Sequence, residues 1–136
     1  MHEIQFSKKD IGSIAKTILQ KSAKIIALNG PMGVGKTTLI TEMVQQLGAV
    51  DLAHSPTFGL VNEYTDREGR LLAYHFDFYR LEDEMEALDM GIEDYFNQDC
   101  WIFMEWSEKI PNLLPPDTLK ITLHMIDTTQ RKVVFQ

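Results

Sequence analysis

Short apolar runs along the chain predict strands. The run over 24–29 (KIIALN) and the run over 101–104 (WIFM) have apolar cores without polar alternation. Runs of this length and composition are typical of strands buried on both faces of a parallel sheet. Residues 3–6 alternate and are more polar, so we expect a short strand at a sheet edge there. The pattern therefore predicts a sheet with a buried parallel centre.

Two segments carry apolar residues at helical spacing. The first covers 11–19, and Ser7 before it is a plausible N-cap. The second begins at Lys36 and reaches Leu47, and Gly48 after it is a typical C-cap. These spacings predict two amphipathic helices, one before and one after the buried run at 24–29 in the sequence.

The remaining segments combine strand and turn signals. Residues 58–78 predict an antiparallel hairpin around the turn Thr65-Asp66-Arg67-Glu68-Gly69, and 119–135 predict another around Asp127-Thr128-Thr129. Residues 82–95 predict an acidic helix that breaks at Gly91. Buried strands flanked by helices, with hairpins besides, predict an α/β fold of three layers with a mixed sheet. Its parallel strands are expected at the centre and its hairpin strands at the edges.

Composition narrows the class of protein. The chain has 136 residues, which predicts a single domain over 1–136. Its 13 Lys and Arg against 20 Asp and Glu give a net charge of −7, which argues against a free-standing nucleic-acid binder. One cysteine, Cys100, excludes an internal disulfide, and no zinc-like spacing is present. The apolar runs are too short to cross a bilayer and the first residues do not resemble a signal peptide, so we expect a cytoplasmic protein with no membrane role.

A phosphate-binding motif lies between the buried run and the second helix. Residues 30–37 read GPMGVGKT, which matches G-x-x-x-x-G-K-[ST] at every fixed position. The strand before the motif and the helix after it are the arrangement that distinguishes such a loop from an ordinary glycine-rich turn. We therefore expect a three-layer P-loop NTPase fold that binds ATP or ADP with Mg²⁺.

Each part of the motif has a physical role. Glycines allow backbone N–H groups to turn toward phosphate oxygens, and the helix N-terminus adds its positive dipole end. Lys36 is expected to reach the β- and γ-phosphates, Thr37 to ligate Mg²⁺, and Thr38 to reach the α-phosphate. The predicted cofactor-binding residues are Gly30, Pro31, Met32, Gly33, Val34, Gly35, Lys36, Thr37 and Thr38.

Such a site also needs a carboxylate at the end of a neighbouring strand. Glu105 follows WIFM directly, and Asp77 follows the less regular LLAYHF. We predict that Glu105 ligates Mg²⁺ and that Asp77 orients a water, although either residue could simply cap a loop. Glu108 is a weaker candidate, since it could begin a solvated helix. The sequence leaves open whether the two strand-end roles are exchanged.

Four further features have two interpretations each. Thr57, in HSPTF, could sense Mg²⁺ or the γ-phosphate as a catalytic residue, or belong to an ordinary proline loop. Trp106 could pack in the core or line the nucleotide pocket. His75 on a strand is more often a core or edge histidine than a catalytic one. The acids between Glu82 and Asp99 could form a solvated helix face or a docking surface for a basic partner.

Taken together and in order, these motifs resemble the bacterial TsaE (YjeE) family. The phosphate loop is followed by SPTF at 55–58, HFDFYRL at 75–81, EWSE at 105–108 and LP at 114–115. The resemblance spans nearly the whole chain, and the later motifs are more specific than the loop. Met32 and Val34 stand where Leu and Ala are commoner in the family, a small departure.

The resemblance implies a function and partners. It implies a P-loop ATPase with Thr37 and Glu105 at the metal, Asp77 as the other essential acid, and Lys36 on the phosphates. The expected partners are a threonylcarbamoyltransferase subunit and its paralogous partner protein, which modify adenosine 37 of tRNA, so that tRNA is contacted only through the complex. ATP hydrolysis would support repeated turnover of that complex and be weak in isolation.

Two other functions stay open on the sequence. A small-molecule kinase of the P-loop class shares the motif but usually adds an arginine-bearing lid, which is not evident here. A nucleotide-dependent adaptor would bind ATP and ADP without hydrolysis. No guanine-recognition signature is evident, which favours ATP over GTP.

Overall fold

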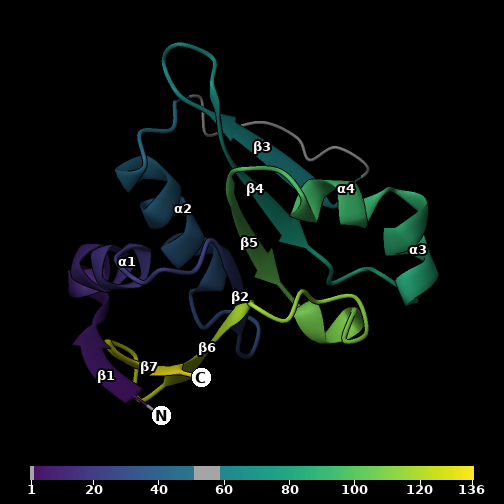
Figure 1. Ribbon diagram of the computed structural model, residues 1–136. Coiled ribbons are helices and arrows are strands. Elements are labelled where there is room, and N and C mark those ends of the chain that lie inside the picture. The colour runs from purple at the N-terminus through teal and green to yellow at the C-terminus, as the bar shows by residue number, and fades with distance from the viewer. Residues whose placement is uncertain (1, 51–58) are drawn as a thin grey trace.

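The fold is a seven-stranded mixed sheet with helices on both faces. We describe it from a computed structural model over residues 2–50 and 59–136, so Thr57 and the rest of its SPTF loop lie outside the described residues. Strands in this part of the chain run in the order β1-β7-β6-β2-β5-β4-β3 across the sheet (Figure 1). Their bounds are β1 His2–Ser7, β2 Ile25–Asn29, β3 Val61–Thr65, β4 Leu71–Asp77, β5 Trp101–Glu105, β6 Leu119–Met125 and β7 Gln130–Phe135.

The centre of the sheet is parallel, as the apolar runs predict. β2 pairs in parallel with β5 on one side and with β6 on the other. Ile26, Ala27 and Leu28 are fully buried in β2, and Ile102 to Met104 are fully buried in β5. A strand covered on both faces cannot place polar side chains toward water, which explains the unbroken apolar runs.

Antiparallel strands complete the sheet on both sides. The hairpin over β3 and β4 is confirmed, and β4 also pairs in parallel with β5. The hairpin over β6 and β7 is confirmed too, and β1 adds to β7 as an edge strand. The prediction of an α/β fold with three layers and a mixed sheet is therefore confirmed.

Helices cover the two faces of the sheet with separate cores. α1 (Ile11–Leu19) and α2 (Lys36–Gln46) pack on one face, where Leu39, Ile40 and Met43 are fully buried. α3 (Glu84–Asp89) and α4 (Ile92–Phe96) pack on the other, and Figure 1 shows them on the side of β5 opposite to α2. Short 3-10 turns, Lys8–Asp10 and Ser107–Lys109, follow β1 and β5.

Helix boundaries differ from the prediction by a few residues, and the first helix begins later than its predicted N-cap implies. Ser7 precedes the 3-10 turn and makes no capping hydrogen bond with its side chain, and the N-cap of α1 is Asp10. Residues Lys8–Asp10 form this turn and bury no side chain, whereas the apolar residues at helical spacing begin at Ile11, where α1 starts. Gly91, with φ of 83°, separates α3 from α4 as predicted. Gly48, with φ of 100°, follows the last turn of α2 in the expected left-handed conformation.

The strand register determines where the functional side chains meet. Asp77 is opposite Glu105 between β4 and β5, and Leu28 is opposite Glu105 between β5 and β2. The carboxyl ends of these parallel strands therefore lie at one edge of the sheet, where α2 begins. Ligands in open α/β sheets bind at this edge.

Candidate nucleotide-binding site

The glycine-rich loop leaves β2 at Asn29 and enters α2 at Lys36. Gly30, Gly33 and Gly35 have φ of 146°, 83° and 115°, conformations that residues with a side chain rarely adopt. A Cβ on Gly30 would lie 2.8 Å from the Leu123 carbonyl oxygen, closer than atoms of this kind approach. The loop therefore needs glycine at Gly30 both for its conformation and for its close approach to β6.

Lys36 is held at the mouth of this loop by two contacts. Its Nζ donates a hydrogen bond to the Gly30 carbonyl at 2.7 Å and lies 3.8 Å from the centre of the Trp106 ring. Burial lowers the pKa of the ammonium group, and this outweighs the raising effect of Glu105, Glu108 and Asp77. A desolvated cation that faces a glycine-rich loop is a strong site for an anion, because little water competes with the ligand.

Thr37, Glu105 and His75 form a hydrogen-bonded row. The Thr37 hydroxyl lies 3.0 Å from Oε1 and 2.8 Å from Oε2 of Glu105 and donates to this carboxylate. His75 Nε2 lies 2.7 Å from the same Oε2. Burial raises the pKa of Glu105, but the hydrogen bonds from His75 and Thr37 and the charges of His75 and Lys36 outweigh it, so the pKa lies below its usual range. Glu105 is thus held as an anion in a buried position.

Trp106 closes one side of the site. Among residues 2–50 and 59–136, Trp106 is the one non-glycine residue with a positive φ, which is 59°. A bulky residue in this conformation costs about 1–3 kcal/mol and persists where surrounding contacts hold it. Those contacts are Lys36 and Tyr79, whose ring centre lies 5.1 Å from that of Trp106 in an edge arrangement. Asp77 is near them and accepts a hydrogen bond from the Tyr79 backbone N–H at 3.1 Å.

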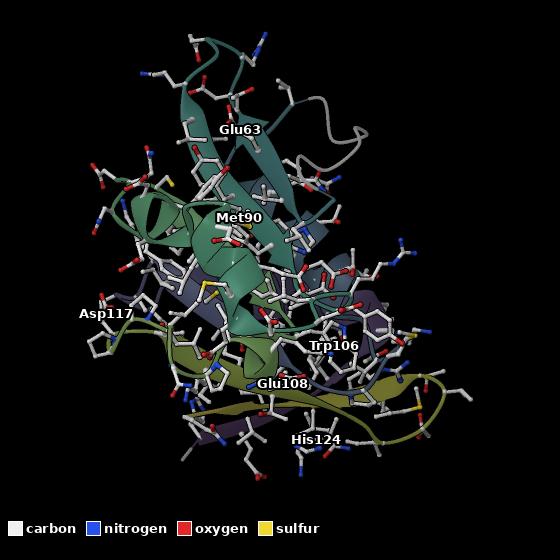
Figure 2. All side chains as sticks on the ribbon, turned by 90° about the vertical axis from the view of Figure 1, so that its right-hand side faces the viewer. Glu63, Met90, Trp106, Glu108, Asp117 and His124 are labelled. Atoms are coloured by element: carbon white, nitrogen blue, oxygen red, sulfur yellow. The ribbon has the colours of Figure 1, made fainter. Side chains whose placement is uncertain are left out.

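These side chains surround a cavity of about 750 Å³. Figure 2 places Trp106 above the C-terminal hairpin, with His124 on the far side of that hairpin. The lining residues are Met32, Gly33, Gly35, Lys36, Thr37, Thr38, Gly59, Leu60, Asn62, His75, Asp77, Tyr79, Arg80, Glu105 and Trp106. A cavity of this size suits a nucleotide or another molecule of several hundred daltons.

Most residues singled out from the sequence meet at this cavity. Trp106 lines it rather than packing only in the core, and both strand-end carboxylates face it. Three loop residues are not part of the lining: Gly30 lies against β6, Pro31 is exposed, and the Val34 side chain is buried in the core. Glu108 lines a separate, smaller cavity with Asn29 and Lys120. Thr57 lies outside the described residues.

Sequence reasoning missed several lining residues. The sequence favours a core or edge histidine at His75, yet this side chain contacts Glu105 directly. Asn62, Tyr79 and Arg80 also line the cavity. The alternation of His75 and Asp77 along β4 is the signal that could have identified His75.

The arrangement of oxygen ligands is compatible with a magnesium ion. Within the described residues, no group of three or more His, Cys, Asp or Glu side chains could hold a metal by itself. Mg²⁺ in nucleotide sites needs no such cluster, because it binds one or two protein oxygens together with phosphates and waters. The Thr37 hydroxyl beside the ionised Glu105 carboxylate supplies such a pair. This pair fits the ion.

Local roles account for part of the acidic segment. Asp83 and Glu86 form a reciprocal capping box at the start of α3. Glu84 accepts hydrogen bonds from the backbone and side chain of Asn112 at 2.8 and 3.1 Å. These three acids therefore stabilise α3 and its attachment to Asn112. Asp99 forms an ion pair with Lys24 at 3.5 Å. Glu82, Asp89, Glu93 and Asp94 are the remaining carboxylates of the segment.

The fold and the loop define a P-loop protein with a mixed sheet. The profile of the TsaE family, described as "Threonylcarbamoyl adenosine biosynthesis protein TsaE", matches residues 6–133. The chain belongs to this family, as its motifs indicate. Within 2–50 and 59–136, no helix has the length and apolar character needed to span a membrane.

Individual relatives agree with the family profile. The chain is 41% identical over 124 residues to the tRNA threonylcarbamoyladenosine biosynthesis protein TsaE of Haemophilus influenzae, covering 91% of this chain and 77% of the relative. It is 36% identical over 115 residues to the protein of the same name from Bacillus subtilis, covering 85% and 70%. A crystal structure of YdiB from Bacillus subtilis has a TM-score of 0.74 and 25% identity, and the match covers 98% of this chain and 84% of that one.

Proposed function

We propose that this protein is a Mg²⁺-dependent ATPase that serves tRNA threonylcarbamoyladenosine biosynthesis. The observation that carries the proposal is the contact between Thr37 of the phosphate loop and Glu105 at the end of β5, at 2.8 Å. It brings the loop hydroxyl and a strand-end carboxylate together beside a desolvated lysine, which is the chemistry that a P-loop nucleotide site requires.

The loop and Lys36 would bind the phosphates. The first N–H groups of α2 have no partners within the helix, so they are free to donate to phosphate oxygens. Lys36 would exchange the Gly30 carbonyl for a phosphate oxygen of much higher charge, which favours binding. Loss of the Gly30 contact is therefore expected when nucleotide enters.

Thr37 and Glu105 would hold the metal. Mg²⁺, when bound, neutralises charge on the phosphates and positions them for in-line attack. His75 keeps Glu105 oriented through its 2.7 Å contact. Asp77 lies opposite Glu105 in the sheet register and would orient a water at the same edge. Thr57 stays a candidate for contacting the γ-phosphate or the metal.

The expected partners are the threonylcarbamoyltransferase subunit and its paralogous partner protein, with ATP hydrolysis supporting repeated turnover of their complex. A net charge of −7 fits this role, since such a protein would reach tRNA through the complex and not alone.

We propose Asp89, Glu93 and Asp94 as acids that dock on a basic surface of the partners. Neutralising all three should weaken the complex, whereas neutralising Asp10, Glu68 and Asp117, with the same charge change, should not.

Calorimetry and co-purification test the proposal. The isolated chain should bind ADP and ATP, hydrolyse ATP slowly, and hydrolyse it faster when the partner complex is added. Phosphate transfer to a small acceptor would identify a kinase instead. Binding of both nucleotides without hydrolysis, even in the assembled complex, would identify an adaptor. Absence of nucleotide binding would contradict all three functions.

A further inference from the structure

The C-terminal hairpin holds the phosphate loop through a buried arginine. Arg131 on β7 is 6% exposed, and its Nε donates a hydrogen bond to the Val34 carbonyl at 3.0 Å. Its Nη1 donates to the Asp127 and Gln130 carbonyls at 2.7 and 3.0 Å. Nε and Nη1 thus donate to three backbone oxygens, and within the described part of the chain no carboxylate lies at ion-pair distance from the guanidinium.

The Asp127 carboxylate interacts with this guanidinium from beyond ion-pair distance. Burying a guanidinium without a direct ion pair is costly, so this position calls for a reason beyond packing. The Val34 carbonyl offers one. A trans peptide points its C=O and the following N–H in opposite directions, and the described residues contain no cis peptide. With the Val34 oxygen turned toward Arg131, the Gly35 N–H of the same peptide turns away from the hairpin. Gly35 lines the cavity.

The rest of the loop supports this geometry. The Val34 N–H is used inside the loop by the Pro31 carbonyl at 3.3 Å, and the Val34 side chain is buried, so neither is free to face a ligand. Gly30 rests against the Leu123 backbone on β6. The hairpin therefore contacts the loop at both ends, and the contact at Val34 determines which way one loop peptide faces.

We propose that Arg131 is a positioning residue for phosphate binding. It orients the Val34–Gly35 peptide so that the Gly35 N–H points into the cavity before any nucleotide arrives. Its buried positive charge also lies behind the loop, where it favours an anion in front of it. This inference rests on the proposed nucleotide site and adds to it a residue about one hundred positions away from the motif.

A matched pair of variants tests it. Arg131→Met and Lys132→Met each remove one positive charge from adjacent positions of β7. Lys132 is opposite His124 in the register, and His124 lies on the side of the hairpin away from Trp106 (Figure 2), so Lys132→Met serves as the control. We expect Arg131→Met to weaken ADP binding by about tenfold, the scale of one charge-assisted hydrogen bond, and Lys132→Met to change it less than about twofold. Calorimetry is done at a temperature where circular dichroism shows each variant folded.

NMR supplies a readout that loss of packing would not produce. On ADP addition, the Gly35 amide proton of the unaltered chain should move strongly downfield, and in Arg131→Met this movement should be smaller. Arg131→Lys, which keeps the charge, should recover part of the affinity. A folded Arg131→Met variant with unchanged ADP affinity and an unchanged Gly35 shift would overturn the proposal.

One measurement needs no variant. Scalar coupling across the hydrogen bond from Arg131 Nε to the Val34 carbonyl carbon should be present in the unaltered chain with and without ADP, and its absence in both states would overturn the proposal even if Arg131→Met does not fold. Failure of the unaltered chain to bind ADP contradicts the proposed function. Normal ADP binding with no effect of Arg131→Met contradicts only the role of Arg131.

Discussion

Thr37 and Glu105, 68 positions apart in the sequence, share a hydrogen bond in which the Thr37 hydroxyl lies 2.8 Å from the carboxylate. If this pair holds Mg²⁺, Glu105→Gln should remove the dependence of ATP affinity on Mg²⁺ while the chain stays folded. The measurement is calorimetric titration of ATP with and without Mg²⁺. Thr37→Ser keeps the hydroxyl and is the control. Equal Mg²⁺ dependence in Glu105→Gln and the unaltered chain would contradict the assignment.

Lys36 should dominate phosphate affinity because its ammonium is desolvated at the loop. Replacing it by Met should weaken ATP binding by about 10- to 100-fold, from the roughly 1.5–3 kcal/mol typical of hydrogen bonds to charged groups. Lys16→Met removes the same charge from the last turn of α1 and should leave the affinity unchanged. Fluorescence competition or calorimetry gives the dissociation constants. A Lys36→Met variant with wild-type affinity would exclude Lys36 from the site.

Trp106 should report nucleotide binding through its emission. Lys36 lies 3.8 Å from the centre of its ring, so displacement of Lys36 toward phosphate changes the charge next to the indole. We expect ADP to alter the intrinsic fluorescence in Trp101→Phe, which keeps Trp106, and most of the change to disappear in Trp106→Phe. The opposite result would show that Trp101, on β5, is the reporter.

Asp127 should make the free energy of unfolding depend on pH. Hydrogen bonds from the backbone N–H groups of Thr129 and Gln130, and the nearby Arg131, hold its pKa below the usual range. A carboxyl with a lowered folded-state pKa stabilises the fold above its unfolded pKa, and this stabilisation is lost as pH falls through the folded value. The urea midpoint of Asp127→Asn should therefore lie below that of the unaltered chain at neutral pH, and the two should converge in acid. Asp117→Asn removes one carboxylate from another exposed position and is the control for the loss of a surface charge.

Cys100 should react slowly with thiol reagents in the folded protein. It is buried, and this burial together with the negative charge of Asp99 raises the pKa of its thiol, so little thiolate is present at neutral pH. As the single cysteine of the chain, it should become fully reactive on unfolding in urea. Rapid modification without denaturant would contradict the burial of Cys100 between α4 and β5.

The sequence was sufficient for the central strands, the loop and the main carboxylates because these depend on local patterns. A fully apolar run such as 101–104 has few structural alternatives, and the residue that follows it, Glu105, must lie at the strand end. The glycine-rich motif similarly identifies the loop and its place between a strand and a helix. For these residues, the local sequence pattern is enough to predict where they lie in the fold.

Contacts that depend on strand pairing were beyond such reasoning. His75 reaches Glu105 only because β4 pairs with β5 in one particular register. Arg131 reaches Val34 only because β7 returns beside β6 and β6 lies next to β2. Alternation can place a polar residue on one face of a strand, but it does not show that the residue is buried or what it contacts, so neither contact could be predicted from the sequence.

The pairing of the loop with the hairpin also has a consequence for biosynthesis. The loop at 30–35 leaves the ribosome long before β6 and β7, yet Gly30 and Val34 obtain their supporting contacts from Leu123 and Arg131. Contacts across so much sequence form late, because the intervening chain must first be made and ordered. A nascent chain that lacks the hairpin would thus display its glycine-rich motif without the scaffold that preorganises it. Nucleotide would then favour the finished fold over its precursors, as a ligand that binds only the native state does.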